Sequence, residues 1–321
     1  MGIEAELVRK LKHILEIARY APSVHNTQPW RVHQDGELLR ITIDHRYKLQ
    51  SGDPTGRETT ISLGIFVEAI CGAAYDNDMS IKKVTFNGGA AVVRFGQYKH
   101  GDQARKFSTL LKARCTDRSL FKRVNLSEDI LESIRRVPYA DKTNIYVVTN
   151  RKTIETTAVL TSKAIRVALS SPSFRSELAD YLKLPWSSAR RGISVLSLGL
   201  PALLGVFEPI LMRLGWGLNL ESNAERRRWQ SASAVVFVTA QGDMPNFWFN
   251  TGRTYLRVCL EIERLGLSQA TSAAIVEASN YHDDIETLIG TRDRILATIR
   301  IGEGTRPRHH SARVNPVELL H

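Results

Sequence analysis

The sequence contains few cysteines, and their spacing argues against two kinds of crosslinked fold. Three cysteines occur among 321 residues, at Cys71, Cys115 and Cys259. They are far apart and lack a C-x-x-C pair, so neither a disulfide framework nor a structural zinc site is indicated. A chain of this length with 43% hydrophobic residues can bury a core without crosslinks. We therefore expect a reducing, cytoplasmic location.

The sequence also lacks an apolar segment suited to export or to crossing a bilayer. Charged residues are scattered through residues 1–15, which is incompatible with the apolar core of a secretory signal peptide. The uncharged run 192–207 is interrupted by Gly199, Pro201 and Gly205 and is shorter than the roughly twenty residues that a spanning helix needs. We expect this run to form a hairpin lid over a pocket, or a contact surface for a partner or a membrane.

The chain has fewer acidic than basic residues. It contains 33 Asp and Glu and 44 Lys and Arg, which gives a formal net charge of +11. Such a chain attracts phosphate-bearing ligands, nucleic acid or an anionic membrane. We favour the phosphates of small cofactors over a nucleic-acid partner. A nucleic-acid or lipid-binding module using the arginines 226–228 and the carboxyl-terminal tail is the alternative, although the basic and aromatic pattern of a recognised RNA or DNA module is missing.

Hydrophobic periodicity predicts a mixture of helices and short strands. Helices are predicted at 7–18, 59–75, 128–137, 154–169 and 251–265, and strands at 31–33, 38–44, 82–86, 91–95, 144–148, 232–240 and 295–301. Asp35 and Gly36 mark a hairpin turn between the first two strands. Regular alternation of strand and helix is missing, so the α+β class is predicted rather than a doubly wound sheet.

A polar loop between two prolines, residues 21–30 (A-P-S-V-H-N-T-Q-P-W), follows the first predicted helix. Pro22 ends that helix. Ser23, Asn26 and Gln28 then offer donors and acceptors beside backbone amides that neither helix nor sheet uses. This is a suitable surface for a flat heterocycle with polar edges. A capping turn without a ligand is the alternative explanation.

The whole loop resembles the P-S-x-x-N-x-Q-P-W motif of the nitroreductase family of flavin enzymes. In that family the loop lies against the isoalloxazine ring of FMN. The resemblance implies that FMN is the cofactor of this chain. It also implies that Pro22, Ser23, Val24, Asn26 and Gln28 contribute to its site.

A second motif, R-C-T-D-R at 114–118, places two guanidinium groups and a hydroxyl close together. This set of groups suits a phosphate, although a solvated basic turn is the alternative. The motif resembles the R-x-S-x-R element with which nitroreductases grip the FMN phosphate and ribityl chain. Arg114, Thr116 and Arg118 take the matching positions, and Cys115 lies between them.

The carboxyl-terminal segment 301–313 resembles the strand, glycine and basic tail of the same family. There a tail arginine meets the phosphate, which implies this role for Arg313, with Arg308 as the second candidate. A solvated basic tail is the alternative. His309 and His310 are adjacent but have no third ligand in view, so no metal site is predicted.

The two motifs lie in different halves of the chain. Typical nitroreductases are homodimers in which one chain supplies R-x-S-x-R and its partner supplies P-S-x-x-N to the same flavin. Here the first half has only the loop and the second half only the arginine motif. The resemblance, which is greatest to the single-chain Acg-like branch, implies an internal pseudo-dimer of residues 1–105 and 106–321. It further implies a lid insertion at about 170–222 and a monomer or homodimer with one flavin site per chain.

The implied activity is hydride transfer from NAD(P)H through FMN N5 to a nitroaromatic, a quinone or a similar electron-poor acceptor. The cofactor carries this chemistry, and no triad or paired-carboxylate signature indicates a catalytic side chain. Ala274 and Ile275 take the positions at which backbone amides of the family face the N5 region of the flavin. The alternative is an FMN-sequestering protein whose lid, including Trp186 and Trp216, shuts out nicotinamide.

Overall fold

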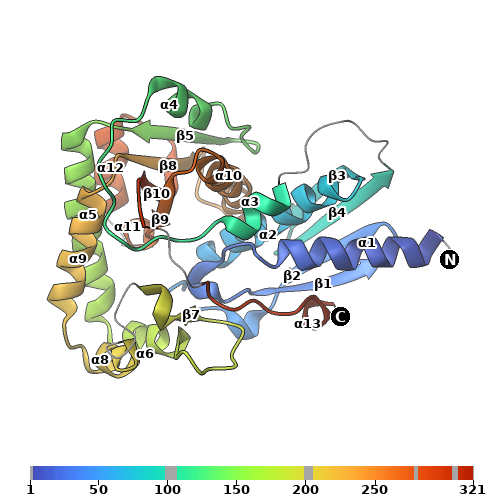
Figure 1. The fold of residues 1–321 in the computed structure, drawn as a ribbon, viewed down its shortest axis with the longest axis horizontal. Helices are drawn as coiled ribbons and strands as arrows, with labels where there is room; N and C mark the ends of the chain where they lie inside the picture. The colour runs from blue at the N-terminus through green and yellow to red at the C-terminus, as the bar shows by residue number, and fades with distance from the viewer. Residues whose placement is uncertain (1–2, 98–106, 199–204, 278–280, 306–309, 321) are drawn as a thin grey trace.

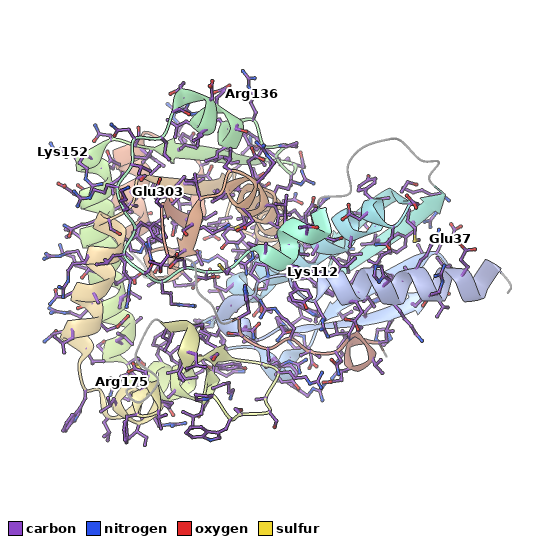
Figure 2. The ribbon with its side chains drawn as sticks, viewed as in Figure 1. Glu37, Lys112, Arg136, Lys152, Arg175 and Glu303 are labelled. Carbon is purple, nitrogen blue, oxygen red and sulfur yellow. The ribbon has the colours of Figure 1, made fainter. Side chains whose placement is uncertain are left out.

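The computed structural model describes residues 3–97, 107–198, 205–277, 281–305 and 310–320. Two antiparallel four-stranded sheets lie on either side of a pair of crossed helices, α2 (Arg57–Asp76) and α10 (Pro245–Arg264) (Figure 1). Charged side chains such as Glu37, Arg136 and Lys152 point away from the ribbon (Figure 2). The predicted α+β class is confirmed.

The first sheet contains the predicted hairpin. Its strands are β1 (Trp30–Asp35), β2 (Leu38–Ile43), β3 (Met79–Asn87) and β4 (Ala90–Gln97), in the spatial order β1-β2-β4-β3. Asp35 pairs with Leu38, and Gly36 supplies the positive φ of 52° that the two-residue turn needs. The helix α1 (Ile3–Ala18) runs beside α2 and leads into the polar loop.

The second sheet repeats the strand order of the first. Its strands are β5 (Thr143–Val148), β8 (Ala234–Ala240), β9 (Ser268–Thr271) and β10 (Arg294–Gly302), in the spatial order β5-β8-β10-β9. In each sheet the strands therefore lie in the order first, second, fourth, third. Other helices are α3 (Phe107–Ala113), α4 (Glu128–Arg135), α5 (Arg151–Ser170), α11 (Ala274–Glu277) and α12 (Tyr281–Ile289).

Two glycines allow α2 and α10 to cross at very short range. A Cβ atom on Gly64 would lie 2.0 Å from the carbonyl oxygen of Phe249, and a Cβ on Gly252 would lie 2.0 Å from that of Ile61. Both distances are impossible for real side chains, so only glycine fits. The reciprocal contact places the starts of the two buried helices, and the residues that precede them, near one another.

The lid segment, residues 170–222, lies between β5 and β8. Its elements are α6 (Pro172–Tyr181), β6 (Leu182–Lys183), β7 (Ile193–Ser194), the 3-10 turn η3 (Val195–Leu198), α8 (Glu208–Leu214) and the start of α9 (Leu218–Gln230). We expect the run 192–207 to form a hairpin. In its described part, β7 instead pairs in parallel with β6, which lies before the run. Among the described helices, none is long and apolar enough to cross a membrane.

The carboxyl-terminal tail returns to the first sheet. Leu320, next to α13 (Pro316–Leu319), forms a bridge with Val32 of β1, and both Val314 and Leu319 are fully buried in the main core. Figure 1 shows this end of the chain beside α1 and β1. The tail is therefore held against the part of the chain that carries the polar loop.

Candidate functional site

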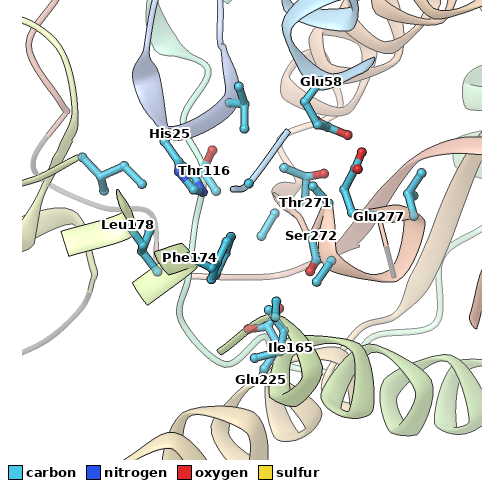
Figure 3. Close-up of a pocket in the computed structure, with 18 of the residues that line it drawn as sticks. His25, Glu58, Thr116, Ile165, Phe174, Leu178, Glu225, Thr271, Ser272 and Glu277 are labelled. Carbon is cyan, nitrogen blue, oxygen red and sulfur yellow. The ribbon is translucent and has the colours of Figure 1, made fainter. Parts of the chain in front are cut away.

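A cavity of about 540 Å³ lies where the polar loop, the start of α2, the second sheet and the lid segment meet. Figure 3 shows side chains from these elements directed toward one space. Among those that line the cavity are His25, Glu58, Thr116, Phe174, Leu178, Thr271 and Glu277. The cavity thus draws on the polar loop and α2 of the first half, on the second sheet and on the lid, as a site shared between two halves would.

The polar loop has a strained backbone that its neighbours hold in place. His25, Asn26 and Gln28 have φ values of 43°, 54° and 47°, in the left-handed region that residues other than glycine rarely adopt. The Ser23 hydroxyl accepts a hydrogen bond from the Gln28 amide at 2.9 Å, and Ser62 Oγ on α2 accepts another loop amide at 3.1 Å. These bonds fix which loop atoms face the cavity.

The side chains of Asn26 and Gln28 connect the loop to the lid and the tail. Asn26 Nδ2 donates to the carbonyl oxygens of Gly192, at 2.8 Å, and Ala312, at 2.9 Å. Gln28 Nε2 donates to the carbonyl oxygen of Arg190 at 2.7 Å, while Gln28 Oε1 accepts a tail amide at 2.9 Å. Both side chains therefore hold three segments together, and neither lines the cavity.

A carboxylate on the lid makes a second connection to the first half. Glu177 of α6 accepts hydrogen bonds from the backbone amides of Gln50, Ser51 and Gly52, at 2.5, 3.1 and 2.8 Å. Several backbone amides aimed at one carboxylate form strong, charge-assisted bonds. Gly52 itself lines the cavity, so this contact closes the lid directly over the site.

Basic side chains gather near Arg118, which lines the cavity. Burial lowers the pKa of Arg118, and nearby Arg228 and Arg114 lower it further. Burial, with Arg114 as a neighbour, lowers the pKa of Arg313 to about 9. The Nε atoms of Arg114 and Arg313 are both buried without a hydrogen-bond partner in the described structure. Buried unpaired cationic donors are costly, and a bound phosphate would satisfy them.

The arginines 226–228 do not form one exposed patch. Arg228 lines the cavity and forms ion pairs with Glu221 at 2.8 Å and Glu225 at 3.2 Å. Glu225 also accepts a hydrogen bond from the Trp229 indole at 2.8 Å. The other two arginines are exposed. One member of the run is thus part of the cavity wall.

Two glutamates that sequence reasoning missed line the cavity together. Glu58, in the first turn of α2, and Glu277, at the end of α11, point toward each other in Figure 3. Burial raises the pKa of Glu58 well above its ordinary range, and Glu277 raises it further. Burial also raises the pKa of Glu277, although Arg57 donates to it at 3.0 Å. The pair is distant in sequence, so no local motif could have revealed it.

The inner face of the lid is formed by residues other than the two tryptophans expected there. Phe174, Leu178 and Met212 line the cavity. The side chains of Trp186 and Trp216 are 70% and 71% exposed and do not belong to the described lining. The expectation that they help to shut the site is therefore wrong, because both point to the outside of the lid.

The structure gathers about half of the predicted site residues at the cavity itself. Those that line it are Pro22, Ser23, Val24, Thr116, Arg118 and Ala274. Those placed behind or beside the lining are Asn26, Gln28, Arg114, Cys115, Ile275 and Arg313. Arg308 lies outside the described residues. The roles of all thirteen in cofactor binding remain predictions.

One set of potential metal ligands exists among the described residues, but the guanidinium group of Arg294 already pairs with its carboxylates. His282, Asp283 and Glu286 have ligand atoms within 4.8 Å of one another. Arg294 donates to Asp283 at 2.7 Å and to Glu286 at 3.5 Å. The group is therefore an ion-pair cluster around a guanidinium.

No family model matches the sequence, but relatives cover almost all of it. "Uncharacterized protein Rv3127" of Mycobacterium tuberculosis is 25% identical over 315 residues, which cover 91% of this chain and 86% of that protein. "Putative NAD(P)H nitroreductase acg" of the same species is 22% identical over 308 residues, covering 91% and 88%. The relationship to Acg-like proteins that the motifs predicted is confirmed.

Solved structures that resemble the chain overlap with about two thirds of it. The FMN- and NADPH-dependent nitroreductase NfnB from sphigopyxis sp. strain HMH is 18% identical, with a TM-score of 0.43, and covers 67% of this chain and 97% of that chain. NfnB from Mycobacterium smegmatis, solved with NADPH, is 16% identical with a TM-score of 0.39.

Proposed function

We propose that this chain is an FMN-dependent oxidoreductase of the nitroreductase type, which uses NAD(P)H to reduce a small electron-poor acceptor. One observation carries the proposal, namely a lidded cavity of about 540 Å³ beside the buried, unpartnered guanidinium nitrogens of Arg114 and Arg313. The volume lies in the range of roughly 300–1,000 Å³ that is usual for cofactor sites. The names of the relatives and of the solved structures agree with this function.

The residues present suit FMN in both shape and charge. Arg114, Arg118 and Arg313 would hold the phosphate, because arginine binds phosphate oxygens in pairs. The polar loop from Pro22 and the backbone at Ala274 would hold the ring. When bound, FMN supplies the capacity to accept and pass on a hydride. The chain binds and orients the reactants, and its lid excludes water from the cavity.

Two tandem halves, 1–105 and 106–321, would build one such site per chain. The repeated strand order of the two sheets and the reciprocal contact of Gly64 and Gly252 support this division. The lid insertion at about 170–222 interrupts the second half after β5. An internal pseudo-dimer is compatible with a monomer, and a homodimer of such chains is the other arrangement we propose.

The function is tested on purified protein by its visible spectrum, followed by addition of NADPH without oxygen. About one FMN per chain that bleaches quickly, and recovers with a quinone or nitroaromatic, is the expected result. One FMN that stays oxidised would point instead to sequestration, which the names of the relatives do not favour. Failure to bind FMN even after reconstitution would refute the proposal.

A further inference from the structure

The pair of glutamates in the cavity wall has too little positive charge around it for both members to be ionised. Arg57 is the nearest cation, and it is shared, since it donates to Glu277 at 3.0 Å and to Asp243 at 3.3 Å. Asp53, whose oxygens accept the amides of Glu58 and Thr59 at 3.1 and 2.8 Å, adds a further acidic group. Other charged groups near this corner are Lys48, which acts on Asp53, and Arg294, which forms an ion pair with Asp243 at 3.6 Å.

The position of Arg57 indicates which member of the pair carries a proton. Arg57 donates to Glu277 and also to the Val276 carbonyl oxygen at 3.0 Å, so the ionised carboxylate is Glu277. Glu58 and Glu277 point toward each other (Figure 3), and a carboxyl can donate to a neighbouring carboxylate only when it is protonated. Two neighbouring carboxyl groups cannot both stay ionised in a site with so little access to water. Glu58 is therefore the neutral acid.

We propose that Glu58 and Glu277 hold one proton at the cavity wall and that Glu58 delivers it to the acceptor reduced there. This inference rests on the proposed function. Reduction of a quinone to a hydroquinone consumes one hydride, derived from NAD(P)H, and one proton. The Glu58 O–H bond breaks, a new O–H bond forms on the substrate oxygen, and the electron pair stays on Glu58. Water then returns a proton to the pair.

The geometry favours this role over a purely structural one. Both glutamates line the cavity, whereas Arg57 and Asp53 behind them do not belong to the described lining. His25, which the polar loop contributes to the cavity, is unsuited to supply the proton, because burial and Arg118 lower its pKa to about 4. A neutral imidazole at pH 7 has no readily released proton.

The first test uses the apoprotein and needs no cofactor. At pH 7 the infrared spectrum of the wild type should contain a protonated-carboxyl C=O band that Glu58→Gln removes. Glu277→Gln should weaken the same band, because loss of the neighbouring negative charge lowers the pKa of Glu58. Glu132→Gln, at an exposed position on α4, is the control and should retain it. A wild type without the band, or a Glu58→Gln variant that keeps it, would overturn the shared proton.

The pH dependence of stability gives an independent reading of the same proton. The pKa of Glu58 is raised in the folded state, so the folded protein keeps a proton that the unfolded chain releases above about pH 4.5. The contribution of Glu58 to stability should therefore fall as the pH rises above that value, and the difference in stability between wild type and Glu58→Gln should change with pH accordingly. A difference between wild type and variant that does not change with pH would contradict the assignment.

The second test uses the FMN-loaded enzyme and separates its two half-reactions by stopped flow. With p-benzoquinone as acceptor, Glu58→Gln should slow the acceptor step at least about tenfold, because general acids contribute about 10²–10⁴-fold. Reduction by NADPH should slow less. Equal acceptor rates in wild type and variant would refute delivery by Glu58. If the protein binds no FMN, or if NADPH does not reduce the bound FMN, the proposed function is refuted, and proton delivery by Glu58 is refuted with it. The infrared band of the apoprotein still tests separately whether Glu58 is protonated.

Discussion

Removal of the Glu177 carboxylate should open the lid without unfolding the protein. Glu177 is the lid residue that accepts the backbone amides of Gln50, Ser51 and Gly52. Glu177→Ala deletes the acceptor and leaves these amides to water. Glu177→Gln keeps the shape and one acceptor oxygen but removes the charge, so it should give an intermediate effect.

The size of the effect follows from the type of bond. A hydrogen bond to a charged group contributes about 1.5–3 kcal/mol. The three amides share one partly exposed carboxylate, so we expect a total of about 2 kcal/mol rather than the sum of three bonds. Because 1.4 kcal/mol is about a factor of ten, lid opening should become roughly 30-fold more frequent in Glu177→Ala. Glu177→Gln should lose about half of this free energy.

Hydrogen–deuterium exchange of the apoprotein measures this opening directly. Amides of α6 should exchange roughly 30-fold faster in Glu177→Ala, while α2 and α10 keep their wild-type protection. Ser176→Ala, at an exposed position on the same helix, is the matched control. Wild-type exchange of α6 in the alanine variant, or equal acceleration throughout the molecule, would refute the role of Glu177 in holding the lid closed.

Three further predictions concern the charged site and the helix crossing. Arg313→Met should raise the melting temperature of the apoprotein, because burial lowers the pKa of Arg313 to about 9, yet it should weaken FMN binding about 10–100-fold and riboflavin binding less; equal losses for both ligands would contradict the phosphate role. The pKa of His25 is lowered to about 4, so as the pH falls the unfolded chain is protonated at this histidine before the folded protein is. This contribution should cost about 2–3 kcal/mol of stability between pH 7 and pH 4.5. Urea titrations of His25→Asn should lack that loss, and asparagine tolerates the positive φ at this position. Gly64→Ala should cost about 2–3 kcal/mol in the same assay, because its Cβ would meet Phe249 O at 2.0 Å, and a neutral result would mean that the helices separate easily.

Local patterns in the sequence predicted most of the elements. The Asp35-Gly36 turn, the buried helix after Arg57 and the apolar strand 234–240 lie where periodicity and turn residues indicated. The same holds for Ser127, which caps α4 by accepting the amide of Ile130 at 3.4 Å. Such features depend on residues a few positions apart, and one sequence is enough to reveal them.

The loop and arginine motifs likewise predicted where much of the cavity wall would be. Pro22, Ser23, Thr116 and Arg118 do line it. The motif could not show that Asn26 and Gln28 turn away from the cavity to hold the lid and tail. That difference depends on the left-handed backbone of the loop and on carbonyl groups that approach from distant parts of the chain.

The sequence by itself determined the α+β class, the relationship to Acg-like proteins and the basic character of the site, because each is written in local patterns or in composition. Only the tertiary structure decided that Glu58 faces Glu277, that Arg228 enters the cavity and that Trp186 faces outward. These facts depend on how α2 and α10 cross and on where the lid closes. Sequence spacing carries no record of such contacts, whereas burial and shared charge in the folded chain set the chemistry of the cavity.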